Sequence, residues 1–460
     1  MSNFWDFSVW GGLSLVAVLM FGLFLANYLK KTVKFLRDSL IPTSVLGGII
    51  LLLISSIYEW ITGNLLFNTD FFGGNGMAAL EVITYHALAL GFIATAFKGG
   101  RAKHTKKRNM EIFNTGVTTV STYLLQGVLG LGITLIVARI VTGFFPAAGV
   151  ILPFGYGQGT GQALNYGSIY ESDYGFVGGR SFGLTIAALG FLSASIGGVI
   201  HMNVMKRRGK IVVSSETADD MRQDEIQKKG EIPMNGTMDK MTVQIGLVVI
   251  TYMIAYLLMY ALSLALLDMR ATIYGFNFLI GVLMSALMKV ILSALTKKNV
   301  IKHQYVNTFL MTRIGNFFFD IMVIAGIAAI RLDVLKNYWL VILILGVVGA
   351  LSTYYYNYYV AKKLFSDYTQ EQFLGMYGML TGTASTGIIL LREIDPKLIT
   401  PASDNLVYQN FPAIVFGFPL MLLATLAPKQ PELTLLILAI FFAVMNVILF
   451  RARIFKKRSK

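Results

Sequence analysis

Two short segments rich in glycine and threonine hold the residues best suited to bind a small ion. The first reads GYGQGTGQA around Gly159, and the second reads GMLTGTASTG around Gly382. Glycine permits backbone conformations that interrupt a helix and lets a ligand approach the main chain closely. N–H groups at a helix start bind anions, and unwound carbonyls with Thr and Ser hydroxyls bind Na⁺. The two segments therefore predict a site for a small carboxylate and a coupling Na⁺ ion.

We expect the ligand contacts to lie in these two segments and on one neighbouring helix. The predicted substrate-binding residues are Gly159, Thr160, Gly161, Gln162, Gly382, Thr383, Ala384, Ser385, Thr386 and Arg313. The predicted sodium-binding residues are Asn165, Asn316, Asp320 and Thr381. We expect no catalytic residue, no metal other than Na⁺ and no cofactor.

Three polar side chains share one apolar segment, residues 304–330. Arg313, Asn316 and Asp320 are spaced three and four apart, so a helix would place them on one face. Ionisable residues within a membrane are costly and mark pathways or pairs. Asp320 would bind Na⁺ and Arg313 would hold a carboxylate with two hydrogen bonds. The alternative is a structural Arg–Asp pair, or an Arg313 side chain that extends to the cytoplasmic surface.

The elements that must position these residues are membrane helices. The chain has 460 residues, of which 55% are hydrophobic and only 14% are charged. Runs of about 20 apolar residues can each cross a hydrocarbon layer of ~30 Å. We predict an all-α polytopic membrane protein with about 11 transmembrane helices, at 9–29, 41–61, 81–97, 112–142, 180–204, 242–267, 272–295, 304–330, 338–361, 404–427 and 432–450. Gln126, a polar residue within one of these spans, is expected to link neighbouring helices.

The distribution of Lys and Arg predicts the orientation of the spans. Most of the 39 basic residues fall in the segments 30–37, 98–108, 206–240, 297–302, 362–363 and 451–460. Cytoplasmic loops collect basic residues, so we place these segments inside the cell, with the N-terminus outside and the C-terminus cytoplasmic. The same rule accounts for the net charge of +15 without a nucleic-acid partner.

This orientation leaves two segments that do not cross the membrane. Residues 143–179 start and finish outside, and residues 364–403 start and finish inside. Each half of the chain is then four spans, a re-entrant hairpin and a fifth span, with opposite orientations, as in secondary transporters. The predicted boundaries are a first repeat at 1–204 with hairpin 146–175, a solvated cytoplasmic linker at 205–240, a second repeat at 241–428 with hairpin 372–392, and an extra C-terminal span with a basic tail at 432–460. The alternative is that both glycine-rich segments are surface loops.

The paired segments, together with five spans and one hairpin in each half, resemble the bacterial sodium:glutamate symporter family and, more distantly, the 2-hydroxycarboxylate transporters. The resemblance covers about residues 1–430. It implies Na⁺-coupled symport of L-glutamate or a similar acidic amino acid by alternating access, with an elevator-like moving domain. It also implies a site between the two hairpin tips, and a homodimer in the bilayer of the bacterial inner membrane. The chain departs from the family in its eleventh span and in GQGTGQ, where a Gly-Gly-His-Gly-Thr pattern is typical.

Other functions would make different demands on the same residues. The runner-up within transport is a symporter for another small carboxylate, such as citrate or malate. An intramembrane aspartyl hydrolase needs two carboxylates close enough to share a proton, and only Asp320 lies at that depth. A serine hydrolase would have to pair Ser385 with His86. A channel needs a ring of like elements around a pore, which two opposed hairpins in one chain do not provide.

Overall fold

The protein is almost entirely helical in the part of the chain that the structure describes. The computed structural model describes residues 3–97, 105–211, 231–232, 238–266, 270–395 and 399–454. The long helices are α1 (Phe7–Thr32), α3 (Thr43–Thr62), α4 (Gly76–Phe97), α5 (Lys106–Ile140), α8 (Gly179–Arg207), α10 (Lys240–Ala265), α12 (Asn277–Lys297), α13 (Thr308–Ala328), α14 (Trp339–Leu364) and α19 (Pro431–Ile454). The shorter helices are α2 (Lys34–Asp38), α6 (Ile151–Gln158), α7 (Thr160–Tyr174), α11 (Arg270–Gly275), α15 (Thr369–Thr381), α16 (Ala384–Arg392), α17 (Ala402–Tyr408) and α18 (Asn410–Leu426).

Ten of the described helices are long and apolar enough to cross a membrane. The pair α17 and α18, which meet at a bend of 51°, makes an eleventh span if it is counted as one. This confirms the prediction of an all-α polytopic membrane protein. The inverted relationship of the two halves and the domain boundaries stay predictions.

The predicted span 404–427 is not one straight helix. α17 ends at Tyr408, and Pro412 follows four residues later in α18. A proline ring clashes with the carbonyl of the residue four positions before it and lacks an N–H donor. The bend therefore falls where the hydrogen-bond ladder of a continuous helix would have been broken.

Several helices begin before the apolar run that predicted them, because polar side chains cap their first turns. The Thr105 side chain accepts a hydrogen bond from the Arg108 N–H at the start of α5. The Asp239 carboxylate accepts hydrogen bonds from the Met241 and Thr242 N–H groups at the start of α10. Such caps satisfy N–H groups that have no partner within the helix. Hydropathy detects only the apolar part of each helix and misses these ends.

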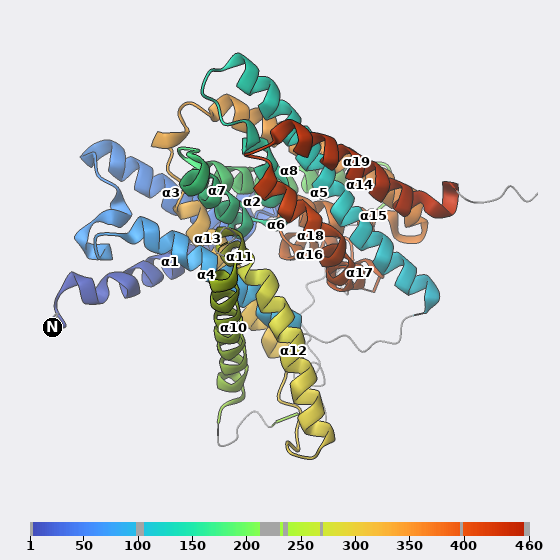
Figure 1. Cartoon of the computed structure of the whole chain (residues 1–460), viewed down its shortest axis with the longest axis horizontal. Helices are drawn as coiled ribbons and strands as arrows, with labels where there is room; N and C mark the ends of the chain where they lie inside the picture. Colours follow the sequence, from blue (N-terminus) through green and yellow to red (C-terminus); the bar gives the residue numbers. More distant parts are fainter. Residues whose placement is uncertain are drawn as a thin grey trace, which may run out of the picture.

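Two long helices, α13 and α5, each pack against several others. α13 packs against α3 and α4, and α5 packs against α14 and α19. α10 and α12 run side by side and extend away from the remaining helices (Figure 1). Small residues allow close helix contact, as at Gly22 of α1 and Gly47 of α3, where a Cβ on Gly47 would lie 3.0 Å from the Gly22 carbonyl oxygen.

The predicted solvated linker, 205–240, lies largely outside the described residues, but its last part packs on the helices. Lys240 Nζ lies 2.9 Å from Glu231 Oε2, and both side chains are almost fully buried. The Asn307 side chain donates to the same carboxylate oxygen at 2.7 Å and also caps α13 by accepting from the Leu310 N–H. The end of the linker is therefore held against the starts of α10 and α13.

Candidate functional site

The first glycine-rich segment folds as two helices separated by one residue. α6 ends at Gln158 and α7 begins at Thr160. Between them Gly159 has φ +80° and ψ −169°, a conformation that is essentially restricted to glycine. Close packing against α8 also requires a small residue at position 155, because a Cβ on Gly155 would lie 2.7 Å from Ile186 Cγ2. The glycines thus set both the break and the close approach of α8.

The second segment has the same organisation. α15 ends at Thr381, and α16 begins at Ala384. The Thr383 hydroxyl caps α16 by accepting a hydrogen bond from the Thr386 N–H at 3.5 Å. α15 and α16 pack closely, since a Cβ on Gly378 would lie 2.8 Å from the Cα of Gly387.

The two breaks are in contact. An ideal Cβ on Gly159 would lie 3.3 Å from Thr383 Cγ2 and 3.8 Å from Phe191 Cζ of α8. A Cβ on Gly382 would lie 3.1 Å from Cδ1 of the same Phe191 ring. Phe191 therefore covers both breaks, and the two glycine-rich segments form one junction.

Contacts along α5 show that the two segments reach this junction from opposite ends of the helix. Thr134 Oγ1 donates to the Pro146 carbonyl at 2.7 Å, and the Tyr123 hydroxyl donates to the Gly157 carbonyl at 3.0 Å. α6 therefore runs antiparallel to α5.

α15 runs in the other direction relative to α5. Gln372 Nε2 donates to Thr115 Oγ1 at 3.2 Å, and Gln126 Nε2 donates to the Leu380 carbonyl at 3.0 Å. Between these two contacts the residue numbers increase in the same direction along α5 and α15, so the two helices are parallel. Both breaks lie level with the middle of α5, which spans 35 residues.

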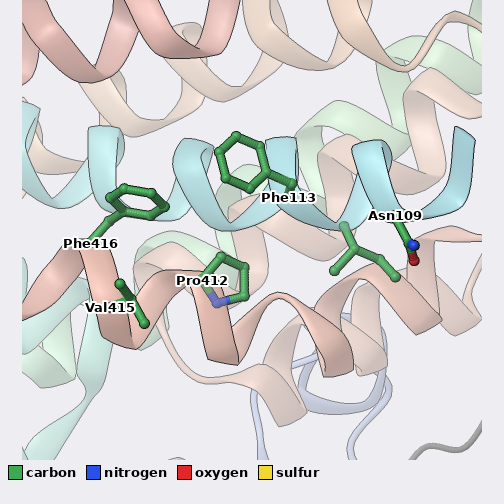
Figure 2. A pocket seen from close by; sticks show the side chains of 6 residues that line it. Asn109, Phe113, Pro412, Val415 and Phe416 are labelled. Carbon is green, nitrogen blue, oxygen red and sulfur yellow. The ribbon is translucent and has the colours of Figure 1, made fainter. Parts of the chain in front are cut away.

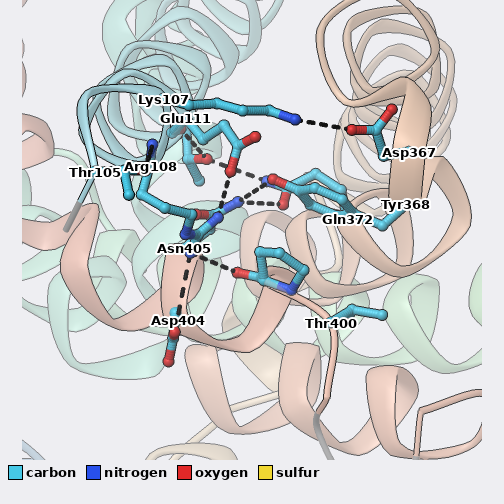
Figure 3. Close-up of polar contacts among 12 residues, drawn as sticks. Thr105, Lys107, Arg108, Glu111, Asp367, Tyr368, Gln372, Thr400, Asp404 and Asn405 are labelled. Carbon is cyan, nitrogen blue, oxygen red and sulfur yellow. Dashed lines mark hydrogen bonds and ion pairs between the residues drawn. The ribbon is translucent and has the colours of Figure 1, made fainter. Parts of the chain in front are cut away.

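A polar cluster fixes the start of α15 against α5 and α17. Arg108 pairs with Glu111 on α5 and lies 3.9 Å from Asp404 on α17. Asn405 Nδ2 donates to the Tyr368 hydroxyl at 3.0 Å and to Gln372 Oε1 at 2.9 Å. Figure 3 shows these side chains converging from the three elements.

The junction carries two helix starts. α7, of 15 residues, and α16, of nine, both begin there. The first N–H groups of a helix have no partner within it, and the helix dipole places partial positive charge at that end. The geometry therefore offers two positive helix ends to one small anion.

The predicted substrate residues of the first segment face different neighbours. The Thr160 hydroxyl is buried and donates to the Met322 carbonyl of α13 at 3.2 Å. Gly161 lies against Leu88 of α4, where a Cβ would be 2.7 Å from Leu88 Cδ1. Gln162 is fully buried, and its Nε2 has no hydrogen-bond partner among the described residues. Gln162 thus carries a buried donor that is free to bind an acceptor.

The predicted substrate residues of the second segment all lie at the break or in the first turn of α16. Thr386 is buried, and its hydroxyl lies 3.4 Å from the Thr383 hydroxyl. Ala384 is exposed. Ser385 lies within α16, and its side chain is outside the described part of the structure.

The predicted sodium-binding residues are not gathered at one point. Thr381 lies at the second break, and its hydroxyl donates to the Tyr377 carbonyl at 2.6 Å. Asn165 lies further along α7, and its Nδ2 donates to the Gly275 carbonyl at 2.6 Å. Asn316 and Asp320 are exposed on α13.

α13 presents two different faces. Met322 and Gly326 face α7, where a Cβ on Gly326 would lie 2.8 Å from Thr160 Cβ. Arg313 and Asp320 are two turns apart and share an exposed face. With 3.6 residues per turn, Asp320 and Met322 point in nearly opposite directions. The structure therefore places Arg313 and Asp320 away from the junction of the two breaks.

Three residues at the junction were not predicted as part of the site. Phe191 and Met322 are apolar residues in apolar spans, and no sequence signal distinguishes them from lipid-facing positions. Tyr123 was likewise missed. Gln126 was expected only as a link between helices, although its polarity in the middle of a span was a usable signal.

A surface groove between α5 and α18 lies apart from this junction (Figure 2). It is lined by Asn109, Ile112, Phe113, Pro412, Val415 and Phe416. Phe113 lies about 15 Å along α5 from Tyr123 at 1.5 Å per residue. We therefore assign the groove no role in the junction.

Comparison with known protein families gives a match that includes both helix breaks. No curated protein matches the chain by sequence. The profile of the sodium/glutamate symporter family matches residues 11–394, a stretch that ends before α17. The match spans most of the chain and includes both glycine-rich segments, the whole of α5 and the whole of α13. The chain therefore belongs to the sodium/glutamate symporter family.

Proposed function

We propose that the protein is a secondary active transporter that couples the entry of Na⁺ to the uptake of L-glutamate or a similar acidic amino acid. The observation that carries this proposal is the contact between Gly159 and Thr383, which joins the starts of α7 and α16. A carboxylate between them would accept hydrogen bonds from both helix ends, as anions do at helix N-termini.

We further propose that the coupling ion uses oxygen atoms close to the same junction. The last carbonyls of α6 and α15 have no partner within their helices. Thr381 would add a hydroxyl oxygen at the second break, and Asn165 would add an amide oxygen from further along α7. Asn316 and Asp320 are proposed as further ligands, and Arg313 as a further substrate residue, in a conformation that turns their face of α13 toward the ligand.

The cellular setting is part of the same proposal. The match to a symporter family and ten candidate spans make this a multi-pass membrane protein. We propose a homodimer in the bacterial inner membrane, with the N-terminus outside and the C-terminus cytoplasmic. Transport would proceed by alternating access, with an elevator-like movement of the helices that carry the junction.

Transport by purified protein in liposomes tests the proposal. Labelled glutamate should accumulate only when an inward Na⁺ gradient is imposed. Equal accumulation with K⁺ in place of Na⁺ would exclude sodium coupling.

Competition by unlabelled acids identifies the substrate class. Glutamate and aspartate should compete with the label, while citrate and malate should not. Competition by citrate or malate, with no uptake of glutamate, would favour a symporter for those carboxylates instead.

A further inference from the structure

One turn of α5 holds both breaks at equivalent positions. The Tyr123 hydroxyl donates to the carbonyl of Gly157, two residues before Gly159, at 3.0 Å. Gln126 Nε2 donates to the carbonyl of Leu380, two residues before Gly382, also at 3.0 Å. We propose that Tyr123 and Gln126 are positioning residues that keep the two breaks in register, so that the starts of α7 and α16 form one site.

Gln126 is anchored by a second partner. Its side chain is fully buried, and Nε2 also donates to Thr353 Oγ1 of α14 at 2.8 Å. An amide nitrogen has two hydrogens, so these two acceptors use both. Rotating the amide would leave the Leu380 carbonyl without its donor. The Leu380 carbonyl can only accept, so it fixes which end of the amide faces the second break, and Thr353 anchors the same nitrogen.

Tyr123 contacts both segments at once. Its ring lies against Gly157, where a Cβ would be 2.5 Å from Tyr123 Cδ1. The same ring packs against the apolar cluster formed by Met376, Met379 and Leu380 of α15 with Leu406 of α17. A shift of either break therefore changes the surroundings of Tyr123, which couples the two.

These hydrogen bonds also affect the charge at the junction. Gly157 and Leu380 lie in the last turns of α6 and α15, where carbonyls lack partners within the helix. Free carbonyls there would repel a carboxylate bound between the breaks. The Tyr123 hydroxyl and the Gln126 amide each engage one of these oxygens, while the first N–H groups of α7 and α16, apart from the capped Thr386 N–H, remain available to an anion.

Hydrogen exchange on the full-length protein tests the proposal without any substrate. The variants are Tyr123→Phe and Gln126→Leu, and the readout is amide exchange, by mass spectrometry, in segments 157–164 and 380–387. Loss of one hydrogen bond should speed exchange in both segments by about two- to tenfold, since the bonded break and its partner loosen together. Thr353→Val replaces Gln126→Leu if the latter does not fold, and should give the same pattern with a smaller effect.

Tyr356→Phe is the matched control. The Tyr356 hydroxyl donates to Asn446 Oδ1 of α19 at 2.9 Å and also lies beside Ser121 of α5, so it links the same region of α5 and α14 without bonding to either break. Exchange in both segments should be unchanged in this variant. The proposal is overturned if Tyr123→Phe affects only 157–164 while Gln126→Leu or Thr353→Val affects only 380–387. It is also overturned if Tyr356→Phe affects both segments as strongly as Tyr123→Phe does.

Glutamate binding in Na⁺ gives a second readout, which rests on the proposed function. Each variant should raise the apparent dissociation constant about three- to tenfold, with a smaller change in the maximal transport rate. The double variant should be less affected than the product of the single effects, because either change already loosens both breaks. Absence of glutamate binding in the unmodified protein would refute the proposed function, and hydrogen exchange would still decide the role of Tyr123 and Gln126.

Discussion

Gly159 and Thr383 lie against one another in the folded protein, although they belong to helix breaks in different halves of the chain. A Cβ on Gly159 would be 3.3 Å from Thr383 Cγ2. The contact brings the start of α7 to the start of α16. Each helix start stabilises a nearby negative charge by about 0.3–1 kcal/mol, and by up to about 2 kcal/mol when partly buried. An anion at this junction would interact with both.

Gly159→Ala should weaken both the fold and glutamate binding. A side chain at φ +80° is strained by about 1–3 kcal/mol, and the new methyl group would press on Thr383. We expect a lower melting temperature and a raised dissociation constant for glutamate, measured on purified protein in Na⁺. Gly132→Ala is the control, because a Cβ there would meet nothing within 4 Å in α5. Equal behaviour of the two variants would argue against a special backbone at Gly159.

Thr383→Val should loosen the start of α16. The substitution keeps the shape of the side chain but removes the hydroxyl that accepts from the Thr386 N–H. Loss of an N-cap typically costs about 0.5–2 kcal/mol. We expect a lower melting temperature and weaker glutamate binding, and both should be restored in Thr383→Ser. Binding that is unchanged in Thr383→Val would mean that the second break has a structural role only.

Gln162→Leu should weaken glutamate binding without lowering the stability of the protein. Gln162 Nε2 is buried without a partner among the described residues, so removing it should leave the melting temperature unchanged or raise it. If this donor meets the substrate carboxylate, glutamate affinity should fall about tenfold or more, since bonds to charged groups are worth about 1.5–3 kcal/mol.

Gln372→Leu is the matched control for that experiment. Both ends of the Gln372 amide are bonded, to Thr115 and to Asn405, so its loss should destabilise the protein by about 1–3 kcal/mol. The role of Gln162 as a ligand donor would be contradicted if Gln162→Leu lowered the melting temperature as much as Gln372→Leu does while glutamate binding stayed intact.

Asp320→Asn tests the second polar face of α13. The carboxylate is exposed within a candidate span, beside Ser44 of α3, and an ionisable group at that depth is costly unless it has a functional or paired role. We expect a higher Na⁺ concentration for half-maximal uptake, with little change in glutamate affinity at saturating Na⁺. Asp367→Asn, in the exposed pair with Lys107, should leave the Na⁺ dependence unaltered. A Na⁺ dependence that is also unaltered in Asp320→Asn would remove Asp320 from the sodium ligands.

The sequence by itself determined the approximate positions of most spans and of the two glycine-rich breaks, but not the bend between α17 and α18 or the capped helix ends. Apolar runs locate the spans because a membrane helix must present apolar side chains over its whole length. Gly159 and Gly382 predict the breaks because glycine relieves the local backbone restraint at those positions. Both signals depend only on neighbouring residues, so one sequence is sufficient to detect them.

Only the tertiary structure decided which side chains meet at the junction. It placed Tyr123, Phe191 and Met322 there, and it turned Arg313 and Asp320 to the opposite face of α13. In a membrane protein the lipid-facing surface is as apolar as the interior, so hydropathy does not reveal how each helix is rotated. That rotation is set by close contacts between segments distant in sequence, such as Gly159 with Thr383 and Gln126 with Leu380.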